Sequence, residues 1–107
     1  MKSDDRERIE HILESCREAQ EFIENKSRSD LHQDRKLELA LNKEIEIIGE
    51  AAAQLSDETR EKFDEIPWKE IIGMRNKLIH DYEEVRRDII WRVVTKDLPE
   101  LIKELED

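Results

Sequence analysis

The feature of this sequence that most constrains its fold is a helical repeat of apolar residues. In residues 4–25, 31–55 and 87–105, apolar side chains recur every three or four positions and therefore share one face of an α-helix. The chain has only two glycines and two prolines, which are too few for the turns of an antiparallel sheet. We therefore expect an all-α protein, whose three longest helices carry these apolar stripes: Ile9, Ile12, Leu13, Cys16, Ala19, Phe22 and Ile23; Leu37, Leu41, Ile45, Ile48, Ala51, Ala52 and Leu55; Ile90, Val94, Leu98, Leu101 and Leu105.

Two polar segments separate the first elements. Residues 25–30 predict a loop, with Ser29 or Asp30 as the N-cap of the helix that begins near residue 31. Residues 56–59, Ser-Asp-Glu-Thr, predict a cap followed by a short helical turn that ends near Phe63.

Two prolines shape the second half of the chain. Pro67 suits the first turn of a third helix, with Trp68 wedged between helices. This third helix is expected to carry four residues inward: Ile71, Ile72, Leu78 and Ile79. Residues 83–86 predict a charged connection, and Pro99 should kink the last helix or restart it with Asp97 as a cap. Together the elements predict an antiparallel four-helix bundle with an extra short helical turn.

Length and composition limit the setting in which the protein works. The 107 residues predict a single domain, residues 1–107, and chains of this size often gain stability by forming oligomers. The only cysteine, Cys16, cannot form an internal disulfide, and its place on an apolar stripe predicts a buried, unreactive thiol. The charged start and the absence of a long apolar run predict a cytoplasmic protein without a signal peptide or membrane span.

The charge of the chain argues against general, sequence-blind binding of nucleic acid. The formal net charge is −10, whereas such binding depends on the neutralisation of phosphates. The charge is uneven, because residues 69–96 contain seven Lys or Arg against five Asp or Glu. This segment could meet a polyanion, but mixed charges of this kind also occur where helix faces simply meet solvent.

Most of the plausible chemistry lies in residues 75–82, Arg-Asn-Lys-Leu-Ile-His-Asp-Tyr, which read R-x4-H-x-Y. On a continuous α-helix Arg75 and His80 would lie about 140° apart, because each residue turns by about 100°. One unbroken helix therefore cannot direct Arg75, His80 and Tyr82 at one small substrate. Either the helix ends near His80, or a second chain completes the site. A two-fold homodimer would bring two copies of the motif to one groove, and we expect such a dimer.

The residue types of the motif suit the cleavage of a phosphodiester. His80 can take a proton from a ribose 2′-hydroxyl or give one to a leaving oxygen. Arg75 can hold a phosphate with two hydrogen bonds and stabilise the charge that builds on it. Asn76 can orient the imidazole or bind the phosphate. Because the attacking group would be the adjacent 2′-hydroxyl, we expect an RNA substrate and no metal or other cofactor.

Other interpretations of these residues stay open. His80 and Tyr82 could instead cap the third helix and pack against it, with Arg75 paired to an acid. Glu44 and Glu50 lie nearest the second stripe and are expected at its solvated edge, or with one of them near Arg75. A ferritin-type metal bundle is not expected, because no histidine of the chain lies three residues after an acid.

The segments around the motif follow a pattern that extends over nearly the whole chain from about residue 4. They are residues 46–52 (Glu-Ile-Ile-Gly-Glu-Ala-Ala), 66–68 (Ile-Pro-Trp), 71–76 (Ile-Ile-Gly-Met-Arg-Asn) and the ending from Trp91 through Asp97, Leu98 and Pro99. Together with residues 75–82, these segments resemble the HEPN superfamily of helical domains and, within it, the HepT-like toxins.

This resemblance implies the toxin of a type VII-like toxin–antitoxin pair, acting as a homodimeric, metal-independent endoribonuclease on RNA such as tRNA or mRNA. Arg75 and His80 would be the catalytic pair, with Asn76 in support. The implied partner is an MntA-like nucleotidyltransferase, an antitoxin that transfers AMP to Tyr82. The added group would place negative charge and bulk in a groove meant for RNA phosphate. The alternative is a non-catalytic HEPN module that binds a nucleotide or positions a minimal nucleotidyltransferase.

Overall fold

The computed structural model describes residues 1–79 and 82–106, so the predicted catalytic His80 lies outside the described residues. Within these ranges the chain forms helices and no strand. The elements are α1 (Ser3–Phe22), α2 (Arg28–His32), α3 (Arg35–Ala53), α4 (Asp57–Lys62), α5 (Trp68–Gly73), the 3₁₀ helix η1 (Met74–Leu78), α6 (Glu83–Arg92), the π-helical turn η2 (Val93–Asp97) and α7 (Leu98–Glu106).

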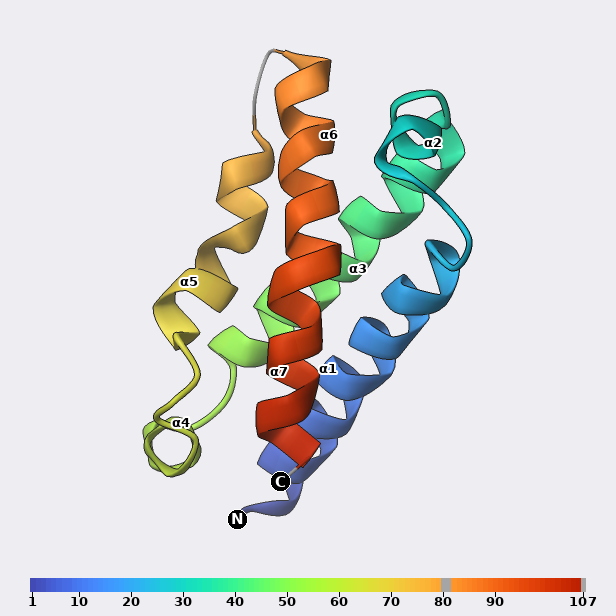
Figure 1. Cartoon of the computed structure of the whole chain (residues 1–107). Coiled ribbons are helices and arrows are strands. Elements are labelled where there is room, and N and C mark those ends of the chain that lie inside the picture. The colour runs from blue at the N-terminus through green and yellow to red at the C-terminus, as the bar shows by residue number, and fades with distance from the viewer. Residues whose placement is uncertain (80–81, 107) are drawn as a thin grey trace.

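Successive long elements run in opposite directions and form the predicted antiparallel bundle (Figure 1). α1 lies along α3, the pair α5 and η1 runs back beside α3, and α6, η2 and α7 return as one rod (Figure 1). The short helices α2 and α4 occupy the connections before and after α3. No helix in the described part of the chain is both long and apolar enough to cross a membrane.

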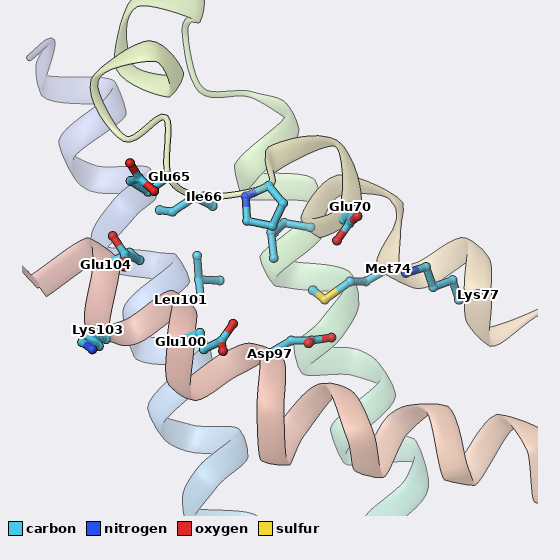
Figure 2. Close-up of a pocket in the computed structure, with 12 residues that line it drawn as sticks. Glu65, Ile66, Glu70, Met74, Lys77, Asp97, Glu100, Leu101, Lys103 and Glu104 are labelled. Atoms are coloured by element: carbon cyan, nitrogen blue, oxygen red, sulfur yellow. The ribbon is translucent and has the colours of Figure 1, made fainter.

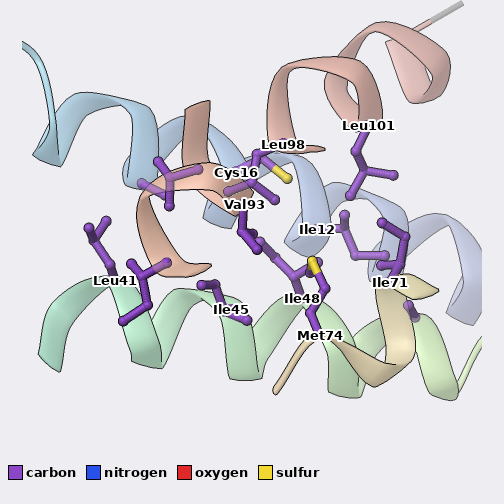
Figure 3. Packing of buried hydrophobic residues seen from close by; sticks show 14 of the residues in the cluster. Ile12, Cys16, Leu41, Ile45, Ile48, Ile71, Met74, Val93, Leu98 and Leu101 are labelled. Carbon is purple, nitrogen blue, oxygen red and sulfur yellow. The ribbon is translucent and has the colours of Figure 1, made fainter. Parts of the chain in front are cut away.

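The three predicted apolar stripes meet in the core (Figure 3). Residues such as Ile12, Leu41 and Ile90 have no exposed surface, and each buried side chain of this size contributes about 1.5–3 kcal/mol. Cys16 lies among them, as predicted, and burial raises the pKa of its thiol to about 12. The thiol is therefore protonated at neutral pH and is not a nucleophile.

The second predicted helix is interrupted, and its predicted caps are wrong. Ser27 caps α2, because its hydroxyl accepts a hydrogen bond from the N–H of Asp30 and the Asp30 carboxylate accepts one from the N–H of Ser27. This reciprocal pair satisfies two free backbone donors at once, so Ser27 takes precedence over Ser29 or Asp30. After one turn the chain starts again at α3, where the Asp34 carboxylate accepts from the N–H of Leu37 at 3.0 Å.

The third helix begins after Pro67, as predicted, and then tightens. α5 ends at Gly73, and η1 continues as a 3₁₀ helix to Leu78. Ile71 and Leu78 are buried, whereas Ile79 is 81% exposed, contrary to the prediction that it points inward. Since the helical run ends at Leu78, Ile79 does not continue the buried face.

Gly49 allows the end of α5 to lie close to α3. A Cβ atom at Gly49 would lie 3.3 Å from the carbonyl oxygen of Ile72, so a larger residue would push the two backbones apart. Trp68, the first residue of α5, is buried and donates from its indole nitrogen to the carbonyl oxygens of Arg60 and Phe63, each at 3.1 Å. Gly49 thus brings α5 close to α3, and Trp68 ties the start of α5 to the end of α4.

The last helix begins earlier than predicted. Residues 83–86 form the first turn of α6 rather than a connection. Glu83 and Glu84 suit this position, because carboxylates are favoured at the positive end of the helix dipole.

The alternative in which Pro99 restarts this helix with Asp97 as a cap is wrong, because the backbone stays helical from Arg92 through Leu98. Proline has no N–H to donate, and its ring would collide with a carbonyl one turn earlier in a regular α-helix. The backbone instead widens into η2, where the N–H of Leu98 bonds to the carbonyl of Val93. In a π-helix the carbonyl of Val94 would accept from the N–H of residue 99, but Pro99 has none. The side-chain amide of Gln20 on α1 donates to this carbonyl instead.

Candidate functional site

Arg75 and Asn76 line a groove between η1 and α3, which we call the site groove. Its volume is about 330 Å³, and its walls are Asn42, Glu46, Arg75, Asn76, Leu78 and Ile79. Asn42 and Glu46 are four residues apart on α3 and so share one helix face. The sequence did not single them out, because spacing shows that two residues share a face but not which element that face meets.

The 3₁₀ geometry of η1 decides which side chains reach the site groove. In a 3₁₀ helix, side chains three positions apart lie in line, so η1 has three lines of side chains. Arg75 and Leu78 form one line, and both line the site groove. Met74 and Lys77 form another line, and both face a different pocket.

The side chain of Arg75 is exposed and makes no hydrogen bond or ion pair with any other residue that the structure describes. The interpretation in which Arg75 pairs with an acid therefore finds no support in residues 1–79 and 82–106. Glu46, the acid in the same groove, lies 4.0 Å from the ammonium group of Lys43 instead. The Arg75 guanidinium is thus available to an anion that enters the groove.

Glu44 and Glu50, the acids named from the sequence, do not line the site groove. Glu50 is exposed, as expected of a residue at the solvated edge. The expectation is wrong for Glu44, which is only 4% exposed and faces Ser15 and Glu18 of α1. Burial, with Glu18 nearby, raises the pKa of Glu44 to about 7. Glu44 belongs to the contact between α1 and α3 and not to the site.

Tyr82 stands at the start of α6 with 75% of its surface exposed, and its side chain caps no helix. The interpretation that Tyr82 packs against the third helix is therefore wrong. That helix ends at Leu78, where the N–H of Ile79 bonds to the carbonyl of Asn76 at 3.4 Å. Of the two alternatives drawn from the sequence, a helix that ends near His80 agrees with the end of η1 at Leu78, while His80 itself lies outside the described residues.

Exposed apolar side chains accompany the motif. Ile79 and Tyr82 are 81% and 75% exposed, and Leu39 and Val85 are 51% and 42% exposed. Leu39 lies one turn before Asn42 on α3, and Val85 lies one turn after Tyr82 on α6. Ile79, Tyr82 and Val85 follow one another at intervals of three residues, and exposed apolar side chains of this size occur on surfaces that contact another protein.

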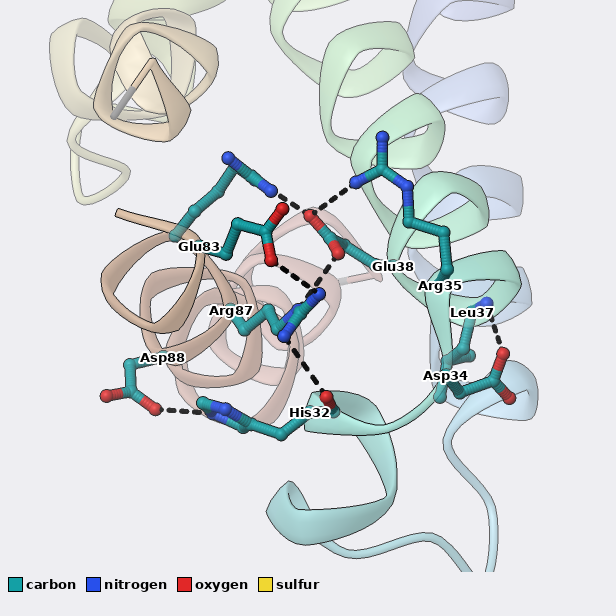
Figure 4. Close-up of polar contacts among 9 residues, drawn as sticks. His32, Asp34, Arg35, Leu37, Glu38, Glu83, Arg87 and Asp88 are labelled. Atoms are coloured by element: carbon teal, nitrogen blue, oxygen red, sulfur yellow. Dashed lines mark hydrogen bonds and ion pairs between the residues drawn. The ribbon is translucent and has the colours of Figure 1, made fainter. Parts of the chain in front are cut away.

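The beginning of α6 is fastened to α3 by the buried carboxylate of Glu38, which is only 3% exposed (Figure 4). Glu38 accepts from the Nε atoms of Arg86 at 2.7 Å and Arg87 at 3.0 Å, and an Arg35 nitrogen lies at 3.3 Å. Burial alone would raise the pKa of Glu38, but the hydrogen bonds from Arg86 and Arg87 outweigh it and lower the pKa. Glu38 is therefore ionised and holds α3 and α6 together. We call Glu38 and its partners Arg35, Arg86 and Arg87 the Glu38 cluster.

Further polar contacts extend from this cluster to α2. Arg87 also donates to the carbonyl oxygen of His32 at 3.1 Å, and the ring of His32 lies 2.8 Å from the carboxylate of Asp88 (Figure 4). Two of the seven cations counted in residues 69–96, Arg86 and Arg87, are thus already paired inside the fold. These two charges are consequently structural, and Arg75 is the one cation among the residues that line the site groove.

Comparisons with known proteins agree over most of the chain. Residues 12–107 match the family model described as "Ribonuclease HepT-like". A protein of Caldanaerobacter subterraneus subsp. tengcongensis, named "Putative RNase", is 44% identical over 99 residues, which cover 92% of this chain and 88% of that protein. A "Putative RNase" of Methanocaldococcus jannaschii is 37% identical over 95 residues, covering 89% of this chain and 87% of the relative. The "Probable ribonuclease HepT" of Thermococcus cleftensis is 35% identical over 101 residues, with 94% and 92% coverage. No solved structure matches the chain.

Proposed function

This chain belongs to the family of HepT-like ribonucleases, and from that membership we propose that it cleaves RNA in the site groove. The observation that carries the proposal is the exposed guanidinium of Arg75, which has no partner among the described residues and lines a groove. A guanidinium of this kind can bind two oxygens of one phosphate. The acidic remainder of the chain would keep RNA away from other surfaces and favour contact at this groove.

The proposed reaction uses the substrate's own hydroxyl. The ribose 2′-oxygen forms a bond to the adjacent phosphorus, and the bond from that phosphorus to the next 5′-oxygen breaks. His80 takes the proton from the 2′-hydroxyl or gives one to the departing 5′-oxygen. Arg75 stabilises the charge on the phosphoryl oxygens, and Asn76 binds the phosphate or orients His80. Such a reaction requires no metal ion, because the attacking oxygen needs no activation by one.

We also propose that two copies of the chain assemble around this site. The exposed apolar side chains Leu39, Ile79, Tyr82 and Val85 support a protein contact beside the motif. A two-fold axis there would bring together two copies of Arg75 and His80, so that one histidine can act as base and the other as acid. Replacing Ile79 and Val85 by Glu should then yield monomers in light scattering and abolish cleavage. A monomeric wild type would refute the dimer.

The test of cleavage compares two neighbouring cations of η1. Arg75→Ala and Lys77→Ala each remove one positive charge, but only Arg75 lines the site groove. With a tRNA pool in excess chelator, we expect Arg75→Ala to cut at least about 100-fold more slowly, the usual effect of losing one charge-stabilising donor. Lys77→Ala should stay within a few fold of wild type. Equal losses in both variants would mean that only net charge matters.

The role of His80 is tested in the same assay. His80→Ala should abolish cleavage by protein whose intact mass shows no added AMP. If unmodified wild type leaves all RNA intact, the catalytic proposal fails and the non-catalytic HEPN module becomes the better account. If His80→Ala cleaves as fast as wild type, His80 is not the catalytic group.

The proposed biological setting is a toxin–antitoxin pair with an MntA-like nucleotidyltransferase. The exposed Tyr82 hydroxyl would attack the α-phosphorus of ATP, so that AMP is joined to Tyr82 and pyrophosphate leaves. The support from the structure is the accessibility of Tyr82, which lies three positions after Ile79 of the site groove. Incubation with such an enzyme and ATP should add one adenylyl mass to the wild type and none to Tyr82→Phe. Modification of Tyr82→Phe would assign the acceptor elsewhere.

A further inference from the structure

A second pocket, which we call the acidic groove, lies on a different side of η1 from the site groove. Its volume is about 370 Å³, and it runs between the α4–α5 connection, the α5–η1 segment and α7 (Figure 2). The floor is apolar and consists of Ile66, Ile71, Met74 and Leu101, which are 2–5% exposed. A volume of this size is within the range of pockets that take up ligands or anchoring side chains.

The rim of the acidic groove carries five carboxylates against two ammonium groups. The carboxylates belong to Glu65, Glu70, Asp97, Glu100 and Glu104, and the ammonium groups to Lys77 and Lys103. None of these seven side chains forms an ion pair or a hydrogen bond with another described residue. Figure 2 shows the carboxylates spread along the groove, with Glu65 and Glu104 at one end and Glu70 and Asp97 at the other.

The negative charge of this rim is only partly compensated, because five carboxylates face two ammonium groups. Burial raises the pKa of Asp97, and the nearby Glu100 and Glu70 add to this effect, against the opposite influence of Arg92 and Lys77. Like charges placed around one concave apolar surface repel one another until a cation enters. With three more carboxylates than ammonium groups on its rim, the acidic groove attracts positive charge.

We propose that the acidic groove docks a basic amphipathic segment of a partner protein. One or two apolar side chains of the segment would contact the floor, and Lys or Arg side chains on either side would pair with the rim carboxylates. Apolar anchors flanked by charges are the usual way in which a helical segment is bound in a groove. A nucleic acid does not fit this surface, because its phosphates would face the carboxylates, and a simple polyamine would leave the apolar floor uncovered.

The position of the acidic groove gives the docking a consequence for the neighbouring site. Met74 and Lys77 face the acidic groove, while Arg75 and Asn76 face the site groove. Both sets of side chains are carried by the same five-residue helix η1. A bound segment would thus touch another side of the same short helix that presents Arg75. The docking itself does not depend on whether the chain cleaves RNA.

The experiment uses the full chain labelled with ¹⁵N and a set of synthetic peptides as probes. The peptides, about three helical turns long, place Leu or Phe at every third or fourth position among Lys and Arg. Matched peptides carry Ser in place of each Leu or Phe. We expect saturable binding, with the largest amide shifts at Met74, Lys77 and Leu101, and at least tenfold weaker binding of the Ser peptides (about 1.4 kcal/mol).

Charge-reversal variants decide whether the binding belongs to the acidic groove. Glu70→Lys with Glu100→Lys should weaken binding at least about tenfold. The control, Glu10→Lys with Glu21→Lys, makes the same change in net charge at exposed positions of α1 outside the groove and should bind like wild type. If the first pair fails to fold, Glu65→Lys with Glu104→Lys tests the other end of the groove.

Four results would overturn the proposal. They are no saturable binding by any peptide, equal binding of the Ser peptides, equal weakening in the control variant, and amide shifts confined to the site groove. The last result would mean that the basic segment recognises a different surface. None of these results bears on the cleavage assay, so the two proposals fail separately.

Discussion

Replacing Glu38 by Gln should cost about 3 kcal/mol of unfolding free energy, because it removes the charge that holds α6 to α3. Arg86 and Arg87 are only 18% and 16% exposed and donate directly to the Glu38 carboxylate. A hydrogen bond to a charged group contributes about 1.5–3 kcal/mol, so two of them set a range of about 3–6 kcal/mol. The lower end applies, since Arg87 keeps contacts with His32 and Glu83 and both arginines can reach some water.

Arg35 adds little to this sum. Its side chain is 61% exposed and lies 3.3 Å from Glu38, and exposed pairs of this kind contribute about 0–1 kcal/mol. For a domain near this size, 1 kcal/mol shifts the melting temperature by about 4–8 °C, so the loss corresponds to about 12–24 °C. Urea unfolding followed by circular dichroism measures the free energy, and calorimetry measures the temperature.

The matched control is Glu83→Gln, which removes another carboxylate partner of Arg87. Glu83 is 64% exposed and lies 3.4 Å from Arg87, so this variant should lose no more than about 0.5 kcal/mol. If Glu38→Gln also stays within about 1 kcal/mol of wild type, the arginines are solvated and the cluster does not fasten α6. Replacing Glu38, Arg86 and Arg87 together by Met should recover most of the unfolding free energy that Glu38→Gln loses, because no buried charge then remains unpaired.

Three further predictions concern contacts that join distant parts of the chain. Because the pKa of Glu44 is raised to about 7, its stabilising contribution is complete below its ordinary pKa and is lost as the pH rises through 7. The free energy of unfolding of the wild type, measured in urea, should therefore fall from pH 5 to 8, and that of Glu44→Gln should not. Hydrogen bonds from the Ser56 side chain, and then from Thr59, lower the pKa of Asp5 to about 2. Asp5 therefore stabilises the fold above pH 4 and loses this contribution as the pH falls toward 2, and Asp5→Asn should reduce that acid-side slope in the same assay. Gln20→Leu should cost about 1–2 kcal/mol by removing the donor to the Val94 carbonyl, and a smaller cost in a Pro99→Ala background would confirm that Pro99 creates the need for it.

The fold was largely predictable because apolar periodicity reports directly on burial. Leu41, Ile48 and Leu98 were placed on buried stripes by spacing alone, and all three have no exposed surface. The break between α2 and α3 was missed, since Ser27, Ser29, Asp30 and Asp34 are all acceptable caps and only the folded backbone decides among them. The π-helical turn was missed for a similar reason, because a second helix had to supply a donor from Gln20.

The site was predictable only in part. The motif identified Arg75 and Asn76, and both lie in the site groove. The opposite wall, which contains Glu46, depends on which face of α3 meets η1, and spacing within one helix does not reveal that face. Glu38 resembled any other charged residue at the edge of a stripe, and its burial depends on two arginines 48 and 49 positions further along the chain. Its role therefore could not be inferred from local sequence.

The long reach of these contacts has a consequence for the timing of activity during synthesis. The hydrogen bond from Gln20 to Val94 spans 74 residues, and that from Arg86 to Glu38 spans 48. Contacts between such distant residues form late, because the intervening chain must first be made and then ordered. A nascent chain that still lacks α6 and α7 has Arg75 but neither the Glu38 cluster nor the complete core behind η1. Any chemistry at the site groove would therefore begin only after the ribosome has delivered the last helices.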